Sequence, residues 1–581
     1  MRTIAQLFIL FFNPFWLIAQ DTKPDTVIFH PNSIRTCIAS NGRLFWTGNG
    51  GLFELPEYSY ETSFMQLGGL WLAGFSGPSG YAGAHQLYDE GEKSDFIPGI
   101  LTDLSEDNEL VPIEGFNRIW RVNRADIEAH IKDYQEDSKI TNPIPSIYRW
   151  PGRGNPHSPE YNGLAIPEYR YEMAPFWDEN FDGIYNPDDG DFPAIEGRSG
   201  FLLPFPDEML WFSFHDYHSN RLTNTPPLAV EVHCLVFGYN CSEGEALDNT
   251  IFVNYTLINK SPARLDSLYA GLFLDFSVGC PEDDYLGTIA ETGTVYAYNA
   301  DSFDDPCPGA TAYGYEPPVV SCTMFEELIV TDAAREEPID TLFLRPFTHI
   351  MPLPGPGETA PLAQAFPVSP LGFYRYLTGR WRDGTPLYFG GNGFQSSNLE
   401  VPYIFPGLPT EPWTWTEKSA QRPPGHRRAI ASSGHFRLSP RGVNRFTVGF
   451  TLHPCFGCFP EGDSEGFGKV HYDINQIKYF LDSYTETPFP CRRPIPPIEP
   501  LPSLPPEIRV GPNPVREQAC IFALHAPAYW YRIFNLHGQL IYEANQPVGT
   551  HVFSVSNWQH GVYILQAAIG GEVLTTKFVV D

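Results

Sequence analysis

The chain carries a dense group of oxygen-bearing side chains in the segment FWDENFDGIYNPDDGD, residues 176–191. Counted from Asp178, acidic or amide residues occupy positions 1, 3, 5, 9 and 12, glycine occupies position 6 and isoleucine occupies position 7. These are the places where an EF-hand-type loop presents oxygen ligands, with glycine at the sharp turn and a backbone carbonyl used at position 7. The spacing therefore predicts a calcium site formed by Asp178, Asn180, Asp182, Ile184, Asn186 and Asp189.

This loop departs from the pattern of an intracellular calcium sensor. Position 12 holds the shorter Asp189, Pro187 follows position 9, and no regular helix is predicted on either side. We therefore expect a structural site like those of extracellular modules, with a dissociation constant on the order of 10⁻⁴ to 10⁻³ M. The alternative is a plain acidic turn, because Asp, Asn and Gly gather in loops for backbone reasons alone.

A second acidic group follows a predicted strand further along the chain. Its spacing fits no calcium template, so a solvated acidic loop is favoured over a second metal site. The group consists of Asp275, Glu282, Asp283, Asp284, Asp301, Asp304 and Asp305.

Other residues that could support catalysis form no recognised motif. The run FHDYHSN (214–220) and His233 supply histidines, but the run is not helical by pattern and is interpreted as surface or core. Trp413 and Trp415 share one strand face and are interpreted as core rather than a sugar platform. The sequence lacks a G-x-S-x-G elbow, a H-E-x-x-H pair and a phosphate-binding glycine loop. No catalytic residue or organic cofactor is predicted, and a secreted hydrolase acting on polysaccharide or peptide stays the alternative function.

The elements that must position these residues are mainly strands. Turn dipeptides recur about every ten residues between β-rich runs at 228–239, 250–261, 268–278 and 445–454, a cadence typical of a sandwich or barrel. Helices are predicted at 123–136, with Asn123 as N-cap, and at 473–484, because apolar residues recur there at helical spacing. We expect a mainly β protein: a β-sandwich-like body with a few packed helices, divided as 21–225 and 226–490.

Composition and the N-terminal segment place the protein outside the cytoplasm. Residues 1–20 combine Arg2, a short apolar run and a small residue near the expected cleavage point, which predicts a cleaved signal peptide rather than a transmembrane anchor. A net charge of −32 argues against nucleic acid binding and suits divalent cations or solubility. Ten cysteines in an exported chain favour structural disulfides.

The C-terminal part is set apart by a proline-rich linker over 491–508, which predicts an extended spacer. Residues 509–581 then alternate polar and apolar residues between glycine turns, which predicts a small antiparallel β-sandwich. The order PNP, NLHG, GVYIL and a final lysine before FVV resembles the type A C-terminal sorting domain of the Bacteroidota type IX secretion system. The positions that match are Asn513, Pro514, Gly538, Gly561, Tyr563 and Lys577.

This resemblance implies export by the type IX secretion machinery, removal of the sorting domain, and often attachment of the rest to surface lipopolysaccharide. The body is similar to uncharacterised exported Bacteroidota proteins, through segments such as GGLWLAG (68–74) and YRYLTGRWRDGTPLYFGG (374–391). That similarity implies no activity. We therefore expect a secreted or surface protein whose body binds a ligand or serves as envelope structure, stabilised by calcium.

Overall fold

The computed structural model of the chain describes most of the body and most of the C-terminal unit. The predicted signal peptide (1–20), linker residues 491–506, and Asn513 and Pro514 lie outside the described residues. The described residues are 23–57, 61–76, 80–88, 93–103, 110–166, 173–197, 202–241, 246–326, 328–331, 338–343, 347–356, 360–410, 414–454, 465–483, 507–511, 515, 518–524, 528–545, 551–569 and 572–580.

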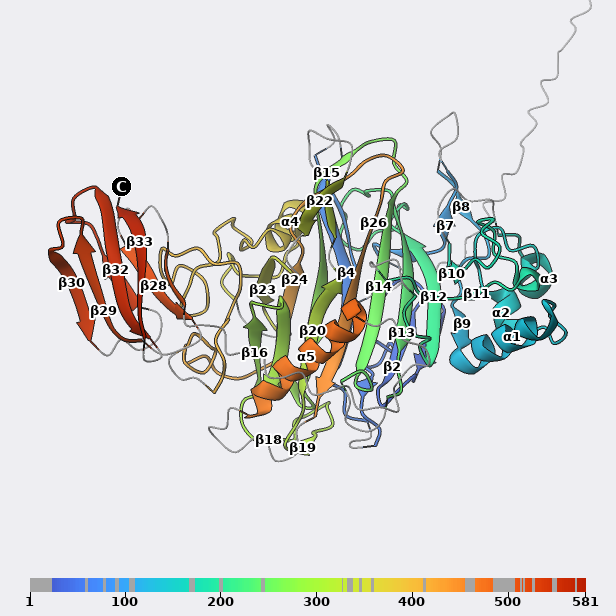
Figure 1. Cartoon of the computed structure of the whole chain (residues 1–581), viewed down its shortest axis with the longest axis horizontal. Coiled ribbons are helices and arrows are strands. Elements are labelled where there is room, and N and C mark those ends of the chain that lie inside the picture. Colours follow the sequence, from blue (N-terminus) through green and yellow to red (C-terminus); the bar gives the residue numbers. More distant parts are fainter. Residues whose placement is uncertain are drawn as a thin grey trace, which may run out of the picture.

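The larger of the two main sheets has nine strands, and neighbouring strands in it are antiparallel (Figure 1). Its order is β16 (Asp284–Ile289), β17 (Thr294–Asn299), β20 (Val319–Glu326), β26 (Val443–His453), β14 (Thr250–Asn259), β13 (Val230–Gly238), β12 (Glu208–His215) and β6 (Ile97–Pro98). The ninth strand, β9 (Trp120–Asn123), also pairs with β12.

The second main sheet has six strands and is centred on one long pair. Its order is β23 (His349–Leu353), β24 (Arg428–Ser432), β15 (Leu265–Phe276), β4 (Met65–Ser76) and β5 (Tyr81–His85), with β25 (Phe436–Leu438) beside β15. The β4–β15 ladder runs from Ser76 opposite Leu265 to Met65 opposite Phe276. Strands from both sides of residue 225 therefore build both sheets.

Shorter strands surround these two sheets. At the start of the chain, β1 (Thr26–Phe29), β2 (Arg35–Ala39) and β3 (Phe53–Glu54) form a three-stranded sheet. Two-stranded ribbons are β7 (Ile100–Leu101) with β8 (Pro112–Ile113), β10 (Phe176–Trp177) with β11 (Phe192–Pro193), β18 (Phe303–Asp304) with β19 (Gly314–Tyr315), and β21 (Ile329–Thr331) with β22 (Pro338–Phe343).

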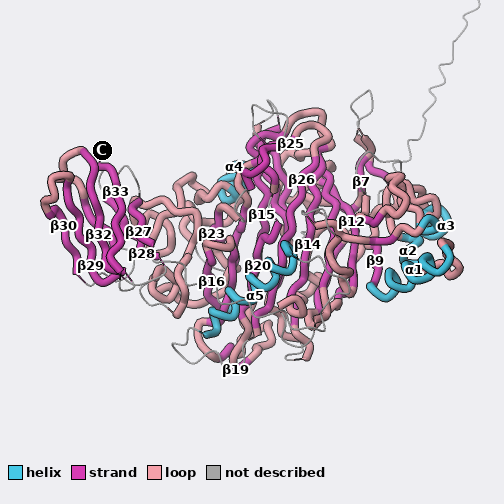
Figure 2. The backbone as a smooth tube through the Cα atoms, viewed as in Figure 1, coloured by secondary structure: helices cyan, strands magenta, loops and turns pink. Residues whose placement is uncertain are grey.

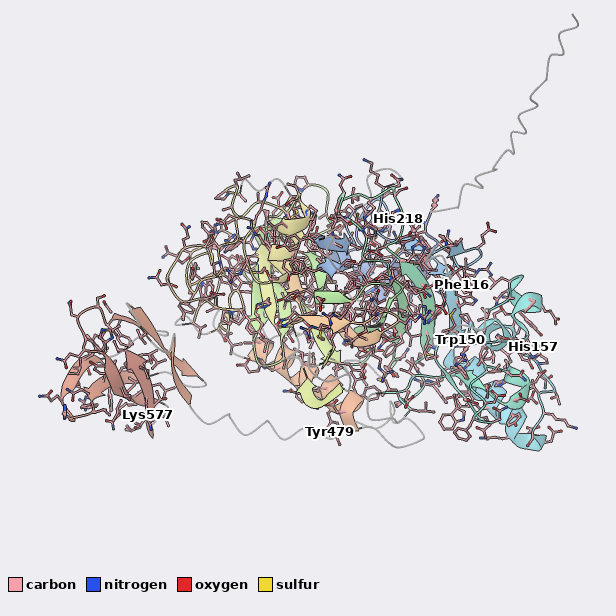
Figure 3. All side chains as sticks on the ribbon, turned by 90° about the horizontal axis from the view of Figure 1, so that it is seen from above. Phe116, Trp150, His157, His218, Tyr479 and Lys577 are labelled. Atoms are coloured by element: carbon pink, nitrogen blue, oxygen red, sulfur yellow. A yellow bond between two sulfur atoms is a disulfide. The ribbon has the colours of Figure 1, made fainter. Side chains whose placement is uncertain are left out.

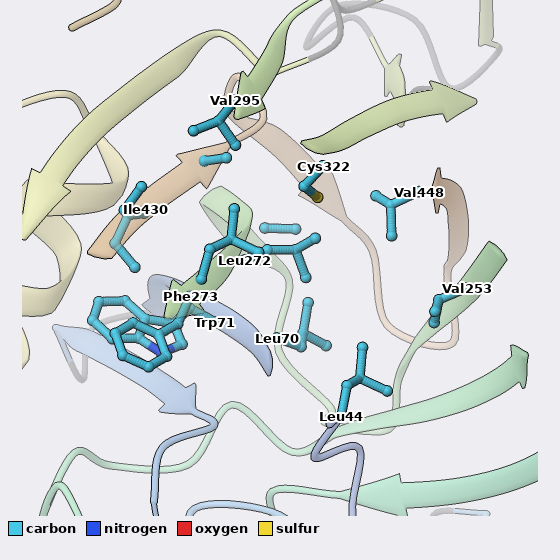
Figure 4. Close-up of a cluster of buried hydrophobic side chains, with 14 of the residues drawn as sticks. Leu44, Leu70, Trp71, Val253, Leu272, Phe273, Val295, Cys322, Ile430 and Val448 are labelled. Atoms are coloured by element: carbon cyan, nitrogen blue, oxygen red, sulfur yellow. The ribbon is translucent and has the colours of Figure 1, made fainter. Parts of the chain in front are cut away.

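The main hydrophobic core lies between the inner faces of the two sheets. Successive side chains of a strand point to opposite faces, so Val232, Cys234 and Val236 of β13 enter this core, while Leu235 and Phe237 enter a second cluster on the outer face. Figure 4 shows the main core, in which Leu70 and Leu272 from the six-stranded sheet meet Val253, Cys322 and Val448 from the nine-stranded sheet. Because both faces of these strands are covered, their sequences read as continuous apolar runs.

Helices cover the outer faces and one edge of the body (Figure 2). Helix α4 (Pro370–Leu377) packs on the six-stranded sheet, and α5 (Glu465–Ser483) packs on the nine-stranded sheet through Phe467, Val470, Ile474, Ile477 and Phe480. Three helices, α1 (Arg124–Asp137), α2 (Pro145–Arg149) and α3 (Ser158–Asn162), gather beside β9. The expected mainly β fold with a few packed helices is confirmed.

Both predicted helices are present, but only the N-terminus of the first was predicted correctly. Asn123 caps α1 as expected, since its side-chain oxygen accepts the Asp126 N–H at 2.9 Å. Helix α5 begins at Glu465, eight residues before the predicted start. Gly466 and Gly468 lie in that first part, and glycine weakens the helical signal in a sequence.

The C-terminal unit is a small antiparallel sandwich, as the sequence predicts. One sheet has the order β27 (Glu507–Gly511), β28 (Gln518–Leu524) and β31 (His551–Ser554). The other has the order β30 (Leu540–Asn545), β29 (Ala528–Asn535), β32 (Gly561–Ile569) and β33 (Glu572–Val580). Their shared core includes Ile521 and Phe553 from the first sheet and Tyr531, Leu565 and Phe578 from the second.

Within the described part of the chain, no helix has the length and apolar character needed to cross a membrane.

The cysteines are of two kinds. Cys280 and Cys307 form a disulfide, and Cys241 is also disulfide-bonded. In contrast, Cys37, Cys234 and Cys322 are buried free thiols, and Cys234 and Cys322 lie in the main core, where cysteine behaves as a small apolar side chain. The expectation of structural disulfides is therefore confirmed in part. The close pair Cys455 and Cys458 lies outside the described residues.

We predict that a thiol reagent will distinguish the two kinds of cysteine. In the native chain Cys37, Cys234 and Cys322 should resist labelling because they are buried, and all three should react after unfolding without reductant. Cys280 and Cys307 should react only after reduction. Peptide mapping by mass spectrometry checks this, with the reduced and unfolded chain as control; labelling of Cys280 in the unreduced chain would contradict the assigned disulfide.

Candidate metal site

The acidic loop 178–191 leaves and rejoins the fold through the short ribbon β10–β11, in which Phe176 lies opposite Pro193 and Trp177 opposite Phe192. Its anchor is Tyr185, which is fully buried. The Tyr185 hydroxyl donates to the Ile147 carbonyl at 2.7 Å, and its backbone N–H donates to the Arg153 carbonyl at 2.8 Å. The loop is therefore fixed against the helical region, where Figure 3 shows Trp150 and His157.

The first half of the loop winds around the Asp178 carboxylate. This group accepts the Asp182 N–H at 3.2 Å and the Gly183 N–H at 2.7 Å, and Asn180 Oδ1 accepts the Asp182 N–H at 3.0 Å. Asp182 Oδ1 in turn accepts the Ile184 N–H at 2.7 Å. Gly183 has a φ of +76°, which is the left-handed turn that position 6 of such a loop requires.

The second half of the loop brings positions 3, 5, 9 and 12 together. The Asn186 amide donates to Asp189 Oδ2 at 2.6 Å. The Asn180 amide donates to Asp182 at 3.0 Å and lies 3.4 Å from Asp189 Oδ2. The Ile184 side chain is a hydrocarbon, so position 7 has only its backbone carbonyl to offer.

The carboxylates of the loop do not form a tight trio. Among the described residues, only Cys280, Asp283 and Asp304 place three possible ligand atoms within 4.8 Å of one another. Asp178, Asp182 and Asp189 are therefore further apart, and the Asn180 amide nitrogen lies between the last two. Calcium binding here would require the Asn180 side chain to turn its oxygen toward the ion.

Asp191 is a loop residue that the sequence pattern does not single out. It is fully buried and accepts the backbone N–H groups of Glu179 at 2.9 Å and Asn186 at 2.8 Å. Burial raises the pKa of the Asp191 carboxyl to about 6, and the charges of Asp178 and Asp182 act in the same direction. Asp191 falls two positions beyond the calcium template, so no spacing rule could have identified it.

The second acidic group is partly buried, so its interpretation as a solvated loop is wrong for Asp275, Asp284 and Asp304. Asp275 is matched by cations, because its carboxylate lies 2.5 Å from His426 Nε2 and 2.6 Å from Arg428 Nε. Asp284 and Asp304 lie elsewhere, at the end of the sandwich next to Asp283.

The histidines and tryptophans noted in the sequence serve the cores or pair locally. His215 is buried, and burial lowers its pKa to about 4. His233 Nε2 lies 2.8 Å from Glu231, and His218 Nε2 lies 3.1 Å from the Asp95 carbonyl. Trp415 is 6% exposed and packs on neighbouring aromatic rings, in agreement with the core interpretation, while Trp413 lies outside the described residues.

A chain of side chains beneath α5 has the order found in serine hydrolases. Ser321 Oγ lies 2.8 Å from His453 Nε2, and His453 Nδ1 lies 2.8 Å from Asp473. Lys469 also contacts Asp473 at 2.8 Å. Ser321, His453 and Asp473 are all at most 1% exposed, so no substrate reaches them in this structure, and we interpret the chain as a polar link between α5 and the sheet.

The C-terminal unit contains four of the six predicted sorting positions within its described part. Gly538 has a φ of +76° in a turn, and Gly561 opens β32. The Tyr563 ring packs in the core while its hydroxyl donates to the Gln559 carbonyl at 2.8 Å. Lys577 is exposed on β33, opposite Ile564 of β32, and is labelled in Figure 3.

Residues 509–581 match the family described as the secretion system C-terminal sorting domain. The chain carries a type IX secretion sorting domain. This domain addresses the protein to the type IX secretion machinery, and the protein is secreted or displayed at the cell surface. The resemblance noted in the sequence is thereby confirmed for the C-terminal unit.

Comparisons over the whole chain add little for the body. The comparison with curated proteins found no match. A polysaccharide lyase structure is 8% identical to this chain, with a TM-score of 0.16. The alignment covers 60% of this chain and 34% of the lyase, so the chain spans about a third of the lyase's length. PorZ, a surface component of the type IX secretion system of Porphyromonas gingivalis, has 10% identity and a TM-score of 0.13, covering 95% of this chain and 74% of its own. TM-scores this low support no inference about the body.

Two loop glycines give a prediction about how the acidic loop is built. Gly183→Ala should lower the free energy of unfolding by about 1 to 2 kcal/mol, because it places a side chain at a residue with a positive φ. The space around this Cβ is open, so the cost is conformational only. Gly190→Ala should lower the free energy of unfolding further, because its Cβ would also lie 2.5 Å from the Tyr134 ring. Chemical denaturation of the full-length chain measures both.

The matched control is a double-mutant cycle with Tyr134→Ala. In that background the loss caused by Gly190→Ala should shrink to that of Gly183→Ala, because the obstructing ring is gone. Equal losses for the two glycine variants in the natural background would contradict the contact between Gly190 and Tyr134.

Proposed function

We propose that this protein works outside the cell as a binding or structural module, with calcium bound in loop 178–191 as a structural ion. Its sorting domain delivers it through the type IX secretion machinery, and the exported body is attached to surface lipopolysaccharide or released. The observation that carries the calcium assignment is the winding of residues 180–184 around the Asp178 carboxylate, with Gly183 in the left-handed conformation.

The charge of the loop supports this proposal. Six carboxylates lie between residues 178 and 191, and His157 contacts one of them, Asp188, at 3.2 Å. Within the described residues, no lysine or arginine forms an ion pair with any of the six. A divalent cation would supply the missing positive charge and relieve the repulsion that contributes to the raised pKa of Asp191.

The position of the loop suggests what the ion would do. Ribbon β10–β11 and the buried Tyr185 connect the loop to α2 and to the cluster that contains Trp120 and Trp211 of the sheet edge. An ion that stiffens the loop therefore also fixes the helical region against the sandwich. The half-exposed ligands and the short Asp189 suit a weak site, which fills at extracellular calcium concentrations.

Hydrogen exchange of the full-length chain tests the site locally. Calcium at ten times its dissociation constant should slow exchange of peptides covering 176–193 by about tenfold relative to chelator, since the ion binds only the closed loop. The double variant Asp178→Ala plus Asp182→Ala should abolish this slowing.

The control variant, Glu128→Ala plus Glu136→Ala, removes two exposed charges from the neighbouring helix α1 and should keep the calcium effect. If calcium leaves exchange in 176–193 unchanged in the natural chain, the loop is an acidic turn and the calcium proposal for it is wrong.

Removal of the C-terminal unit should stop export at the outer membrane. A chain truncated at Leu501 is expected to accumulate in the periplasm of its host, because it lacks the domain that addresses the secretion machinery. Cell fractionation and protease accessibility of intact cells measure the location. As a control, residues 507–581 fused to a periplasmic reporter should carry that reporter outside; surface display of the truncated chain would overturn the sorting assignment.

A further inference from the structure

A second acidic cluster lies at the corner where the chain passes from one main sheet to the other. Strand β15 belongs to the six-stranded sheet and β16 to the nine-stranded sheet, and residues 277–283 connect them through the short helix η3 (Pro281–Asp283). The ribbon β18–β19 lies against this connection, because the Cys280–Cys307 disulfide joins the two segments. Asp283 and Asp304 are brought together here, with ligand atoms within 4.8 Å.

Three oxygen atoms at this corner receive no hydrogen bond from any residue in the described part of the chain. They are Asp283 Oδ1, Asp284 Oδ1 and Asn299 Oδ1. Asp284 is fully buried and Asn299 is 7% exposed, and the two residues lie directly opposite each other in the β16–β17 ladder. A buried acceptor without a donor is unfavourable, and here three belong to one connection between the sheets.

The other oxygens of the cluster are held by backbone N–H groups. Asp284 Oδ2 accepts from Val278 at 2.9 Å, and Asp283 Oδ2 accepts from Asp305 at 3.0 Å. Asp304 accepts from Cys280 at 3.0 Å and also from the Tyr313 N–H. The three carboxylates are thus fixed in place by the fold.

Gly279 shows that the fold is shaped around this cluster. A Cβ at this residue would lie 1.7 Å from Asp304 Oδ2, and Gly279 has a φ of +73°. Only glycine lets the backbone approach the Asp304 carboxylate so closely.

The nearby guanidinium of Arg427 is already paired with another carboxylate. Arg427 acts on Asp284 from a distance, but its guanidinium is paired with both Glu417 oxygens at 2.7 to 3.0 Å. Burial raises the pKa of Asp284 well above its usual range, and the charges of Asp283 and Asp304 add to that shift. Burial raises the pKa of Asp304 to about 6, and the charges of Asp283 and Asp305 act in the same direction. The Cys280 sulfur is bonded to Cys307, so it supplies no thiolate.

We propose that this corner is a second divalent-cation site, separate from loop 178–191, at which calcium is bound between Asp283 and Asp304 and draws in Asp284 and the amide oxygen of Asn299. Asp284 lies outside the group of ligand atoms within 4.8 Å, so its carboxylate would turn toward the ion, as Asn180 would in the loop. All four donors are oxygens, the set that calcium prefers and zinc does not. The ion supplies the partner that the three donor-free oxygens lack. It also fixes the corner between the two sheets together with the disulfide.

The test uses the full-length chain and calcium alone as probe. Equilibrium calcium binding should give two sites per chain for the natural protein, one site for Asp178→Ala plus Asp182→Ala, and one site for Asp283→Asn plus Asp284→Asn. Calcium should also slow hydrogen exchange of peptides covering 277–305, and this slowing should survive in the Asp178/Asp182 variant. The two proposed sites can therefore fail independently.

The single variant Asp284→Asn adds a signature that a purely structural carboxylate would not give. In chelator its unfolding midpoint should exceed that of the natural chain, because on folding Asp284 must either take up a proton or bury a charge, whereas asparagine does neither and keeps an acceptor for the Val278 N–H. In calcium the order should reverse, and calcium affinity at this site should fall at least tenfold.

Asp301→Asn is the matched control, since it removes the same charge from an exposed residue of the neighbouring loop. It should change calcium affinity at the corner much less than Asp284→Asn. The proposal is overturned if hydrogen exchange of peptides covering 277–305 in the natural chain is equally fast with calcium and with chelator. It is also overturned if Asp283→Asn plus Asp284→Asn leaves the number of bound ions unchanged.

Discussion

The structure of the body depends on the burial of the inner faces of its two sheets against each other. This burial places β15 and β16, which follow each other in the chain, in different sheets, so the chain must turn a corner over residues 277–283. Backbone N–H groups at such a corner lose the partners that a ladder would give them. Asp284 and Asp304 accept those of Val278 and Cys280, so the acidic cluster follows from the packing of the sheets.

Local pattern and tertiary contact explain what the sequence could and could not predict. The strands at 230–238, 250–259, 265–276 and 443–453 were predictable because apolar residues fill both faces of each strand. The N-terminal half of α5 was missed because glycines interrupt its helical pattern. The order of the sheets could not be predicted, since it is set by pairings such as β14 with β26, which are far apart in the chain.

The same distinction separates the two acidic sites. All proposed ligands of loop 178–191 lie within twelve residues, so spacing alone predicts the site, although it misses the buried Asp191. The corner draws Asp283 and Asp284, Asn299 and Asp304 from three segments that the β16–β17 ladder and a disulfide bring together. No spacing rule connects these residues, and for this reason the sequence alone led to the interpretation of the acidic group as a solvated loop.

The two sites should also differ in how much an ion contributes to stability. In loop 178–191, Asn180 and Asp182 are exposed, so water screens part of the loop's charge and calcium gains less by neutralising it than at a fully buried cluster. At the corner, Asp284 is fully buried, and an uncompensated charge there is far more costly. The corner therefore has more to gain from each ion, and it lies where the two sheets of the sandwich meet. For an acidic protein exported beyond the outer membrane, calcium at the corner would strengthen the sandwich itself, while calcium in the loop would fix the helical region at its edge.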